Sequence, residues 1–198
     1  MRGVIPCPAQ KGQAMKIIFL DFDGVLVTRR SLRRRSPEDR KTLDEVAAIA
    51  HKGDSACVAE LNRVCAATGA KLVVSSSWRK VGAHLNSLEY VKDVLRVWGV
   101  TAEAVGVTPQ LERPVCFVDA GGNKRTIYQS ALRGTEIQEW LTANVEPPVT
   151  NFAIVDDESD MCHLLPRLVQ TEFEEGLTPA HADRLIQMLG ENLFTATS

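Results

Sequence analysis

Short apolar runs alternate along the chain with longer segments of helical periodicity. Runs of this length predict buried strands at 16–21, 70–76 and 151–157, with weaker strands inside 102–110 and at 167–171. Capping residues, helix-type spacing of apolar residues and terminal glycines predict helices over 36–50, 55–69, 85–99, 134–144 and 178–190. This alternation predicts an open α/β fold of three layers, α/β/α, in which helices wrap a mainly parallel sheet.

The length of 198 residues fits one domain. We expect an N-terminal extension over 1–15, the domain over 16–190 and a C-terminal tail over 191–198. Within the domain, 105–133 is richer in glycine, proline and polar residues and is interpreted as a lid or binding loop. No apolar run approaches the length of a membrane span, and the first residues lack the apolar core of a signal peptide.

Composition narrows the function classes. The formal net charge of −2 implies no global attraction to nucleic acid or to a membrane. The five cysteines are scattered and have no metal-ligand spacing, which favours a reducing, cytoplasmic setting.

Three predicted strands end in polar residues that are capable of chemistry. Their sequences are "LDFDG", "VVSSSWR" and "IVDDESD". A parallel sheet brings the carboxyl ends of its strands to the same edge, where ligands bind in this class of fold. We therefore expect the three polar segments to meet.

The first segment holds two carboxylates. Asp21 and Asp23 alternate along an extended chain, so both project to one side. Two such groups repel each other unless a cation joins them or one carries a proton. Taken alone, a pair of this kind is more typical of an ordinary loop or a helix cap.

The third segment supports a metal site. Asp156 and Asp157 would bring the number of carboxylates at the edge to four, a set suited to Mg²⁺. The competing interpretation is an acidic first turn that stabilises the next helix, and Asp160 fits that role.

The second segment offers donors for an anion. Ser75, Ser76 and Ser77 present hydroxyl groups and backbone N–H groups where a strand turns into a loop. A phosphate beside four acids also needs positive charge. Arg133, directly before a predicted helix, is the first candidate; Lys124 and Arg125 are the alternatives.

In their order along the chain, "DFDGVL", "LVVSSS", a basic residue before a helix and "IVDDESD" resemble the four motifs of the haloacid dehalogenase (HAD) superfamily. More narrowly, "SSSWR", "RGTEIQEWL" and "LVQTEFEEGLT" are similar to the compact HAD domain of Swiss-army-knife RNA-repair proteins. The resemblance spans roughly 16–190. It implies a Rossmann-like (HAD-like) sheet with Mg²⁺ at its carboxyl edge and little or no cap.

The resemblance also implies roles for residues. Asp21 would be the nucleophile that forms an aspartyl-phosphate and also a metal ligand. Asp23 would be the general acid and base, with its backbone carbonyl on the metal. Ser76, or Ser75 if the strand ends one residue earlier, would bind phosphate together with Arg133, which stands where lysine is usual. Asp156 and Asp157 would complete the metal site, and Asp160 would support them.

The substrate is less well defined. An open site favours a large phosphate ester such as a nucleic-acid end, and the arginines of 29–35 are candidates for contacting its phosphates. Their alternative role is a solvated loop that balances the acidic site. Two other functions stay open, namely a small-molecule or nucleotide phosphatase and a non-catalytic protein that binds metal and phosphate.

Overall fold

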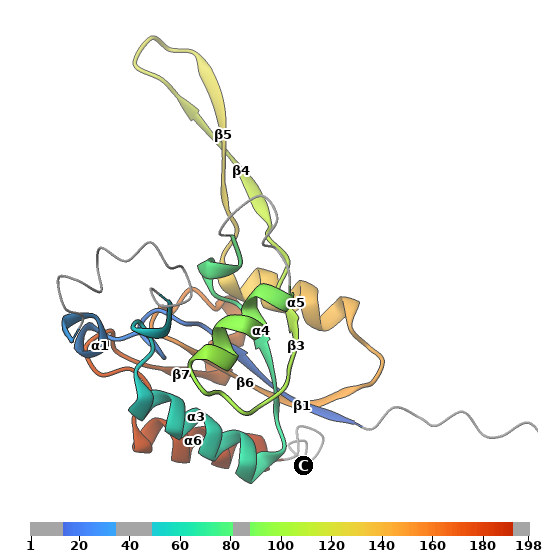
Figure 1. Ribbon diagram of the computed structural model, residues 1–198. Helices are drawn as coiled ribbons and strands as arrows, with labels where there is room; N and C mark the ends of the chain where they lie inside the picture. The colour runs from blue at the N-terminus through green and yellow to red at the C-terminus, as the bar shows by residue number, and fades with distance from the viewer. Residues whose placement is uncertain (1–13, 35–48, 81–87, 192–198) are drawn as a thin grey trace, which may run out of the picture.

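The computed structural model describes residues 14–34, 49–80 and 88–191. Its main sheet contains five strands in the order β3-β2-β1-β6-β7, and every pairing in it is parallel. The strands are β1 (Met15–Leu20), β2 (Lys71–Val74), β3 (Ala104–Val107), β6 (Val149–Asp156) and β7 (Leu168–Gln170). β1 lies at the centre, between β2 and β6 (Figure 1).

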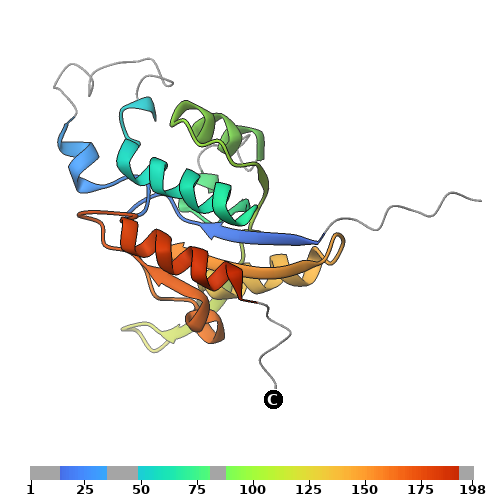
Figure 2. The same cartoon turned by 90° about the horizontal axis from the view of Figure 1, so that it is seen from below.

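Helices cover both faces of this sheet (Figure 2). One face packs in a large apolar cluster against α3 (Ser55–Thr68), α4 (Leu88–Val97) and α6 (Pro179–Gly190). The other face packs against α5 (Arg133–Ala143) and the 3₁₀ helix η2 (Cys162–Arg167). Alternation along β1 sends Ile18 and Leu20 to the first cluster and Ile17 and Phe19 to the second, as a strand buried on both faces requires. The predicted three-layer α/β fold is confirmed.

The predicted elements agree with the structure to within a few residues at most ends. The expected strand inside 102–110 is β3, and the expected helix over 134–144 is α5. A short helix, α1 (Arg29–Arg33), and the 3₁₀ helix η1 (Ser77–Lys80) follow β1 and β2 and were not predicted. Most of the helix expected over 36–50 lies outside the described residues.

The stretch 105–133 is more regular than the loop that was expected. It contains β4 (Glu112–Val118) and β5 (Lys124–Ser130), which pair antiparallel as a separate two-stranded sheet. This hairpin leaves the carboxyl edge of the main sheet and extends away from the rest of the molecule (Figure 1). Whether it acts as a lid stays a prediction.

Within residues 14–34, 49–80 and 88–191, no helix has the length and apolar character needed to cross a membrane.

Candidate functional site

The ends of β1, β2 and β6 lie side by side at one edge of the sheet. Hydrogen bonds continue the pairing beyond the strands: the Asp21 amide donates to the Val155 carbonyl at 3.1 Å, and the Ser75 amide donates to the Leu20 carbonyl at 2.9 Å. Asp156 is the last residue of β6. The polar segments that follow the three strands therefore begin next to one another.

Three carboxylates converge there. Asp21, Asp156 and Asp157 each offer an oxygen, and the three oxygens lie within 4.8 Å of one another. Asp21 and Asp156 are buried, and Asp157 is partly buried. Burial and the neighbouring Asp21 raise the pKa of Asp156 to about 8 and also raise the pKa of Asp157. An all-oxygen set of crowded acids of this kind fits a hard divalent cation.

Gly24 makes room for this cluster. Its φ of +70° belongs to the left-handed region that glycine adopts without strain. A Cβ at this position would lie 2.3 Å from Cγ of Asp157. The glycine in "DFDG" therefore serves both the turn after β1 and the placement of the third carboxylate.

Asp23 lies beside the cluster and has a different partner. Its Oδ2 accepts a 2.8 Å hydrogen bond from Nε1 of Trp78. The Trp78 ring is held edge-to-face against Phe22, with 5.7 Å between ring centroids, and against Trp98, with 5.5 Å. Burial raises the pKa of Asp23, and the Trp78 hydrogen bond opposes that shift. This contact was not predicted from the sequence, and the only signal that could have suggested it is the tryptophan directly after the three serines.

Arg133 supplies positive charge inside the site. It begins α5, and its Nη1 lies 3.0 Å from Oδ1 of Asp21 while its Nε lies 3.3 Å from Oδ2 of Asp156. Burial disfavours a charged guanidinium, but the Asp21 and Asp156 carboxylates outweigh that effect and raise the pKa of Arg133. The alternative candidates, Lys124 and Arg125, lie exposed on β5 in the hairpin.

Asp160 fixes the start of α5, the helix that precedes β6, rather than the start of a following helix. Its Oδ2 accepts a 2.9 Å hydrogen bond from the Arg133 amide, and its backbone carbonyl accepts one from the Gly134 amide at 3.2 Å. A Cβ on Gly134 would lie 2.2 Å from the Met161 carbonyl oxygen. The "RG" pair therefore lets α5 approach the loop after β6 closely enough for Arg133 to reach the acids.

Ser75 and Ser76 are both fully buried where β2 ends. The Ser76 hydroxyl accepts a long hydrogen bond, 3.4 Å, from the Trp78 amide. The Ser75 hydroxyl has no hydrogen-bond partner among the described residues, and its carbonyl accepts from the Arg133 side chain. Which of the two hydroxyls binds an anion stays a prediction.

A buried ion pair behind the site was not predicted. Arg79 and Glu136 are 2% and 3% exposed and form an ion pair, although 57 residues separate them in the sequence. Arg79 Nη1 also donates to the Ser75 and Ser76 carbonyls, and Glu136 Oε1 accepts from the Leu111 amide at 3.1 Å. The pair thus joins the serine segment, α5 and the base of the hairpin.

Comparison with known proteins identifies a family for the chain. The family model described as the HAD domain in Swiss Army Knife RNA repair proteins matches residues 17–182. No curated protein matches the chain. The match covers every element from β1 to the first turn of α6 and includes all the site residues described above. The chain therefore belongs to the family of HAD domains found in Swiss Army Knife RNA repair proteins.

Proposed function

We propose that the protein is a Mg²⁺-dependent phosphohydrolase that acts through an aspartyl-phosphate. Family membership supports a hydrolase of the phosphatase type. The proposed metal dependence and aspartyl-phosphate are supported by the position of Asp21. Its carboxylate lies with those of Asp156 and Asp157 in a cluster that could hold a metal ion, and it also contacts Arg133. A carboxylate in such surroundings can act as a nucleophile toward phosphorus because the nearby positive charge offsets the charge of the phosphate.

The residues present fit a divalent cation. Asp156 Oδ2 is buried and accepts no hydrogen bond from the described residues, and its cationic neighbour is Arg133, whose Nε lies 3.3 Å away, so this buried carboxylate is left under-satisfied without a metal cation. Asp21, Asp156 and Asp157 would hold the ion, with the Asp23 carbonyl as a further oxygen ligand. When bound, Mg²⁺ would reduce repulsion between the substrate phosphate and the acids and would polarise the phosphoryl oxygens.

The protein's own residues would carry two steps. In the first, an Asp21 oxygen forms a bond to phosphorus while the bond from phosphorus to the ester oxygen breaks, and Asp23 donates a proton to that departing oxygen. In the second, water attacks the phosphorus of the aspartyl-phosphate and Asp23 takes a proton from the water. The Asp21 carboxylate is restored and phosphate leaves. Arg133 and a serine at the end of β2 would hold the other phosphoryl oxygens.

Trapping the covalent intermediate tests the nucleophile directly. Asp23→Asn should slow the second step, while the first step still proceeds for p-nitrophenyl phosphate, whose leaving group needs no proton. ³²P from this ester should then stay on the chain as a hydroxylamine-sensitive bond. Asp21→Asn combined with Asp23→Asn should trap nothing. Label retained in the double variant would exclude Asp21 as the nucleophile.

We further propose that the substrate is a nucleic-acid end, which is consistent with the RNA-repair context of the family. The arginines of α1 support this proposal because they follow the Asp21–Asp23 segment and their side chains are exposed. Arg29 and Arg30 pair with Glu174 and Asp54, whereas Arg33 and Arg34 form no ion pair within the part of the chain that the structure describes. A cytoplasmic setting belongs to the same proposal.

A further inference from the structure

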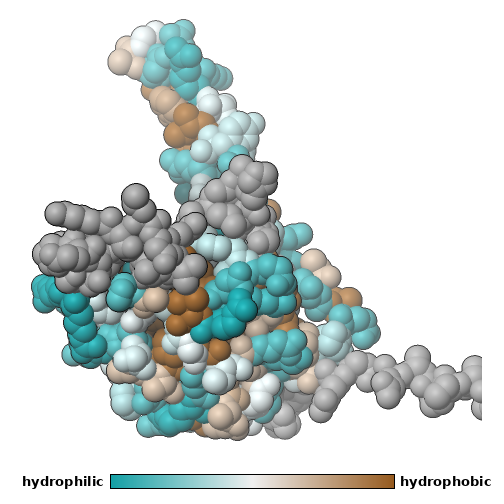
Figure 3. Space-filling view, in the orientation of Figure 1, coloured by the Kyte–Doolittle hydropathy of each residue, from teal (hydrophilic) through white to brown (hydrophobic). Residues whose placement is uncertain are grey.

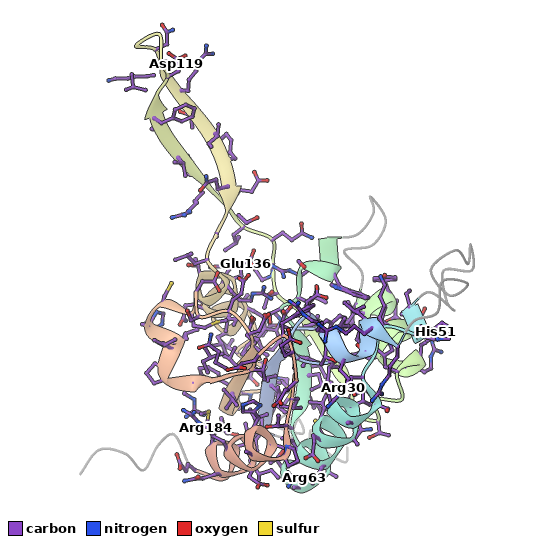
Figure 4. All side chains as sticks on the ribbon, turned by 90° about the vertical axis from the view of Figure 1, so that its left-hand side faces the viewer. Arg30, His51, Arg63, Asp119, Glu136 and Arg184 are labelled. Atoms are coloured by element: carbon purple, nitrogen blue, oxygen red, sulfur yellow. The ribbon has the colours of Figure 1, made fainter. Side chains whose placement is uncertain are left out.

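The hairpin of β4 and β5 lacks the support that two-stranded sheets usually need. Its register runs without a break from Glu112 opposite Ser130 to Val118 opposite Lys124, and no third strand joins it among the described residues. Side chains along it point into open space, from Asp119 at the tip down to the level of Glu136 at the base (Figure 4). A lone hairpin is at best marginally stable in water. An additional partner is therefore expected.

The apolar residues of the hairpin lie on both of its faces. Phe117 and Ile127 are each 44% exposed, Val118 is 63% exposed and Tyr128 is 69% exposed. Opposed residues share a face, so the register places Phe117 and Ile127 on one face and Val118 and Tyr128 on the other. Hydrophobic atoms are visible partway along the hairpin in Figure 3. A strand added at an edge would give neighbours to side chains on both faces at once.

The two edges of the hairpin are not equivalent. Hydrogen bonds from the Asp119 amide to the Asn123 carbonyl and from the Ala131 amide to the Leu111 carbonyl mark the two ends of the pairing. Hydrogen-bonded and non-bonded pairs alternate along an antiparallel ladder. The backbone N–H and C=O groups of odd-numbered residues therefore point to the other strand of the hairpin, and those of even-numbered residues point outward. On β4 an outward position is Pro114, which has no N–H.

The outer edge of β5 keeps every backbone donor, whereas that of β4 lacks one at Pro114. The outward positions of β5 include Thr126 and Tyr128, and the strand contains no proline. Its side chains are mostly β-branched, aromatic or polar and uncharged, which is the composition of an edge that accepts another strand.

We propose that the protein forms a twofold dimer in which β5 pairs antiparallel with β5 of a second copy, centred on Ile127. In this register Thr126 lies opposite Tyr128 of the second copy and bonds to it through both backbones. Ile127 lies opposite its own equivalent, and Arg125 lies opposite Gln129. The result is a four-stranded sheet with a β-branched residue paired to an aromatic one and no like charges facing each other, in a self-complementary contact. This inference does not depend on the proposed function.

A single-stranded nucleic acid is a less suitable occupant of the hairpin. Such ligands are bound by aromatic side chains arranged beside free cations. Phe117 and Tyr128 lie on opposite faces, and Arg125 is engaged by Asp119 at 2.9 Å. The open backbone edge of β5 is matched by a strand rather than by a phosphate chain.

The first test is the mass of the full chain in solution, by sedimentation equilibrium from 1 to 100 µM. We expect a reversible dimer in this range. A chain that stays monomeric at the highest concentration would overturn the proposal. If, in addition, substitutions in the hairpin of this monomer changed only its binding of a single-stranded oligonucleotide, the hairpin would be a nucleic-acid site instead.

A cysteine introduced on the twofold axis tests the register. Ile127→Cys should form a disulfide-linked dimer under mild oxidation, since a directly opposed, non-bonded pair has Cα atoms about 4.5 Å apart, within disulfide range. Three native cysteines are replaced by serine in this background: Cys7, Cys116 and Cys162. The matched control is Val115→Cys on β4, whose equivalents would lie about 14 Å apart, three strand spacings, and should not cross-link. Equal cross-linking of both variants would contradict this register.

Proline substitution tests the edge. Thr126→Pro removes an outward N–H of β5 without removing a bond inside the hairpin, just as Pro114 is tolerated on β4, and should weaken dimerisation at least tenfold. Cys116→Pro removes an outward N–H of β4 and should leave the dimer intact. If circular dichroism shows that Thr126→Pro does not fold, the comparison of Ile127→Cys with Val115→Cys tests the interface by itself. A dimer that is insensitive to Thr126→Pro in a folded chain would overturn the proposed interface.

Discussion

The indole Nε1 of Trp78 donates a 2.8 Å hydrogen bond to Oδ2 of Asp23. This contact engages one oxygen of the carboxylate and restricts the rotation of the side chain, so that Oδ1 is the oxygen left for proton transfer. A group that must give a proton to a departing oxygen depends on such orientation, because general acid catalysis requires the proton within hydrogen-bond reach. Trp78 is therefore expected to act as a positioning residue for Asp23.

Replacing Trp78 by phenylalanine tests this role. Trp78→Phe keeps an aromatic ring against Phe22 but removes the N–H. We expect kcat to fall about tenfold for an alkyl phosphate, whose leaving oxygen needs a proton, and to change little for p-nitrophenyl phosphate, whose leaving group is stable as an anion. Steady-state rates on both esters provide the measurement.

The matched control is Trp98→Phe. Trp98 packs in the same aromatic group, but its Nε1 donates to the Ile49 carbonyl at 2.8 Å instead of to an acid. Trp98→Phe should therefore change kcat by the same factor for the alkyl phosphate and for p-nitrophenyl phosphate. If both tryptophan variants lose activity equally on both substrates, Trp78 has only a packing role.

The strand ends were predictable from the sequence because each combines a short apolar run with the polar residues that follow it. That pattern is local. The parallel sheet then brings Asp21 and Asp156 together, because the carboxyl ends of its strands lie at one edge. The contacts of Trp78 and of Arg79 were not predictable, since they depend on how the η1 turn directs side chains toward segments far away in the sequence. Glu136, the partner of Arg79, reads in the sequence as an ordinary acid in the first turn of a helix.

The hairpin was missed for a different reason. Glycine, proline and polar residues suggested a loop between 105 and 133, whereas two runs rich in β-formers, "PVCFV" and "RTIY", flank the turn "DAGGN". That arrangement is a hairpin signal. Average composition over the whole stretch concealed it.

Arg133 should be sensitive to a conservative change. Lysine keeps one charge but cannot reach Asp21, Asp156 and the Ser75 carbonyl together, as the guanidinium does. We expect Arg133→Lys to lower kcat/KM about tenfold and Arg133→Ala to lower it by about 10²-fold or more. Arg125→Ala, which removes the exposed arginine on β5, serves as the control and should keep full activity per folded molecule. Loss of activity on replacing Arg125 but not Arg133 would reverse the assignment.

Metal binding can be measured without turnover. Mg²⁺ at about 100 times its dissociation constant would stabilise the folded chain by about 2.7 kcal/mol, which raises the unfolding midpoint by several degrees for a chain of this size. Asp156→Asn removes one carboxylate from the cluster and should abolish most of that shift. Asp183→Asn, on the exposed surface of α6, should leave it unchanged. An Asp156→Asn protein with the full Mg²⁺ shift would exclude Asp156 as a ligand.

Asp54 should make folding stability depend on pH at the acidic end. Burial alone would raise the pKa of Asp54, but hydrogen bonds from Arg30, Thr28 and the Ala56 amide outweigh it and hold the pKa below its ordinary value. A lowered folded-state pKa gives stability that is complete above the unfolded value of about 3.9 and is lost as the pH falls through the folded value.

Asp54→Asn isolates this charge because asparagine is also a good N-cap for α3. We expect it to lower the free energy of unfolding by about 1–2 kcal/mol at pH 7. The difference from the wild type should stay constant down to about pH 4 and narrow below it, as measured by urea denaturation at pH 7, 5 and 3. A difference as large at pH 3 as at pH 7 would show that the charge of Asp54 is not what stabilises this segment.

The arginines of α1 separate a nucleic-acid substrate from a small one. Arg33 and Arg34 are exposed at the end of α1, beside Glu174 and Glu175, where they line a surface hollow together with Arg30. Replacing both Arg33 and Arg34 by alanine should raise KM for a phosphorylated oligonucleotide about tenfold at moderate salt while leaving KM and kcat for p-nitrophenyl phosphate unchanged. The loss should shrink as salt rises, because phosphate contacts release counterions and are weakened by salt.

The matched control for the α1 variant is Arg63→Ala. Arg63 lies exposed on α3 and is engaged by Glu60 and Asp183, so its loss removes a surface charge away from α1. An enzyme that turns over mononucleotides as fast as oligonucleotide ends, with no response to either arginine change, would be a small-molecule phosphatase. A chain that binds Mg²⁺ but releases no phosphate from any ester would be a binding protein. Neither outcome would contradict the proposed metal site, because that proposal rests on the oxygens of Asp21, Asp156 and Asp157, which lie within 4.8 Å of one another, and not on the identity of the substrate.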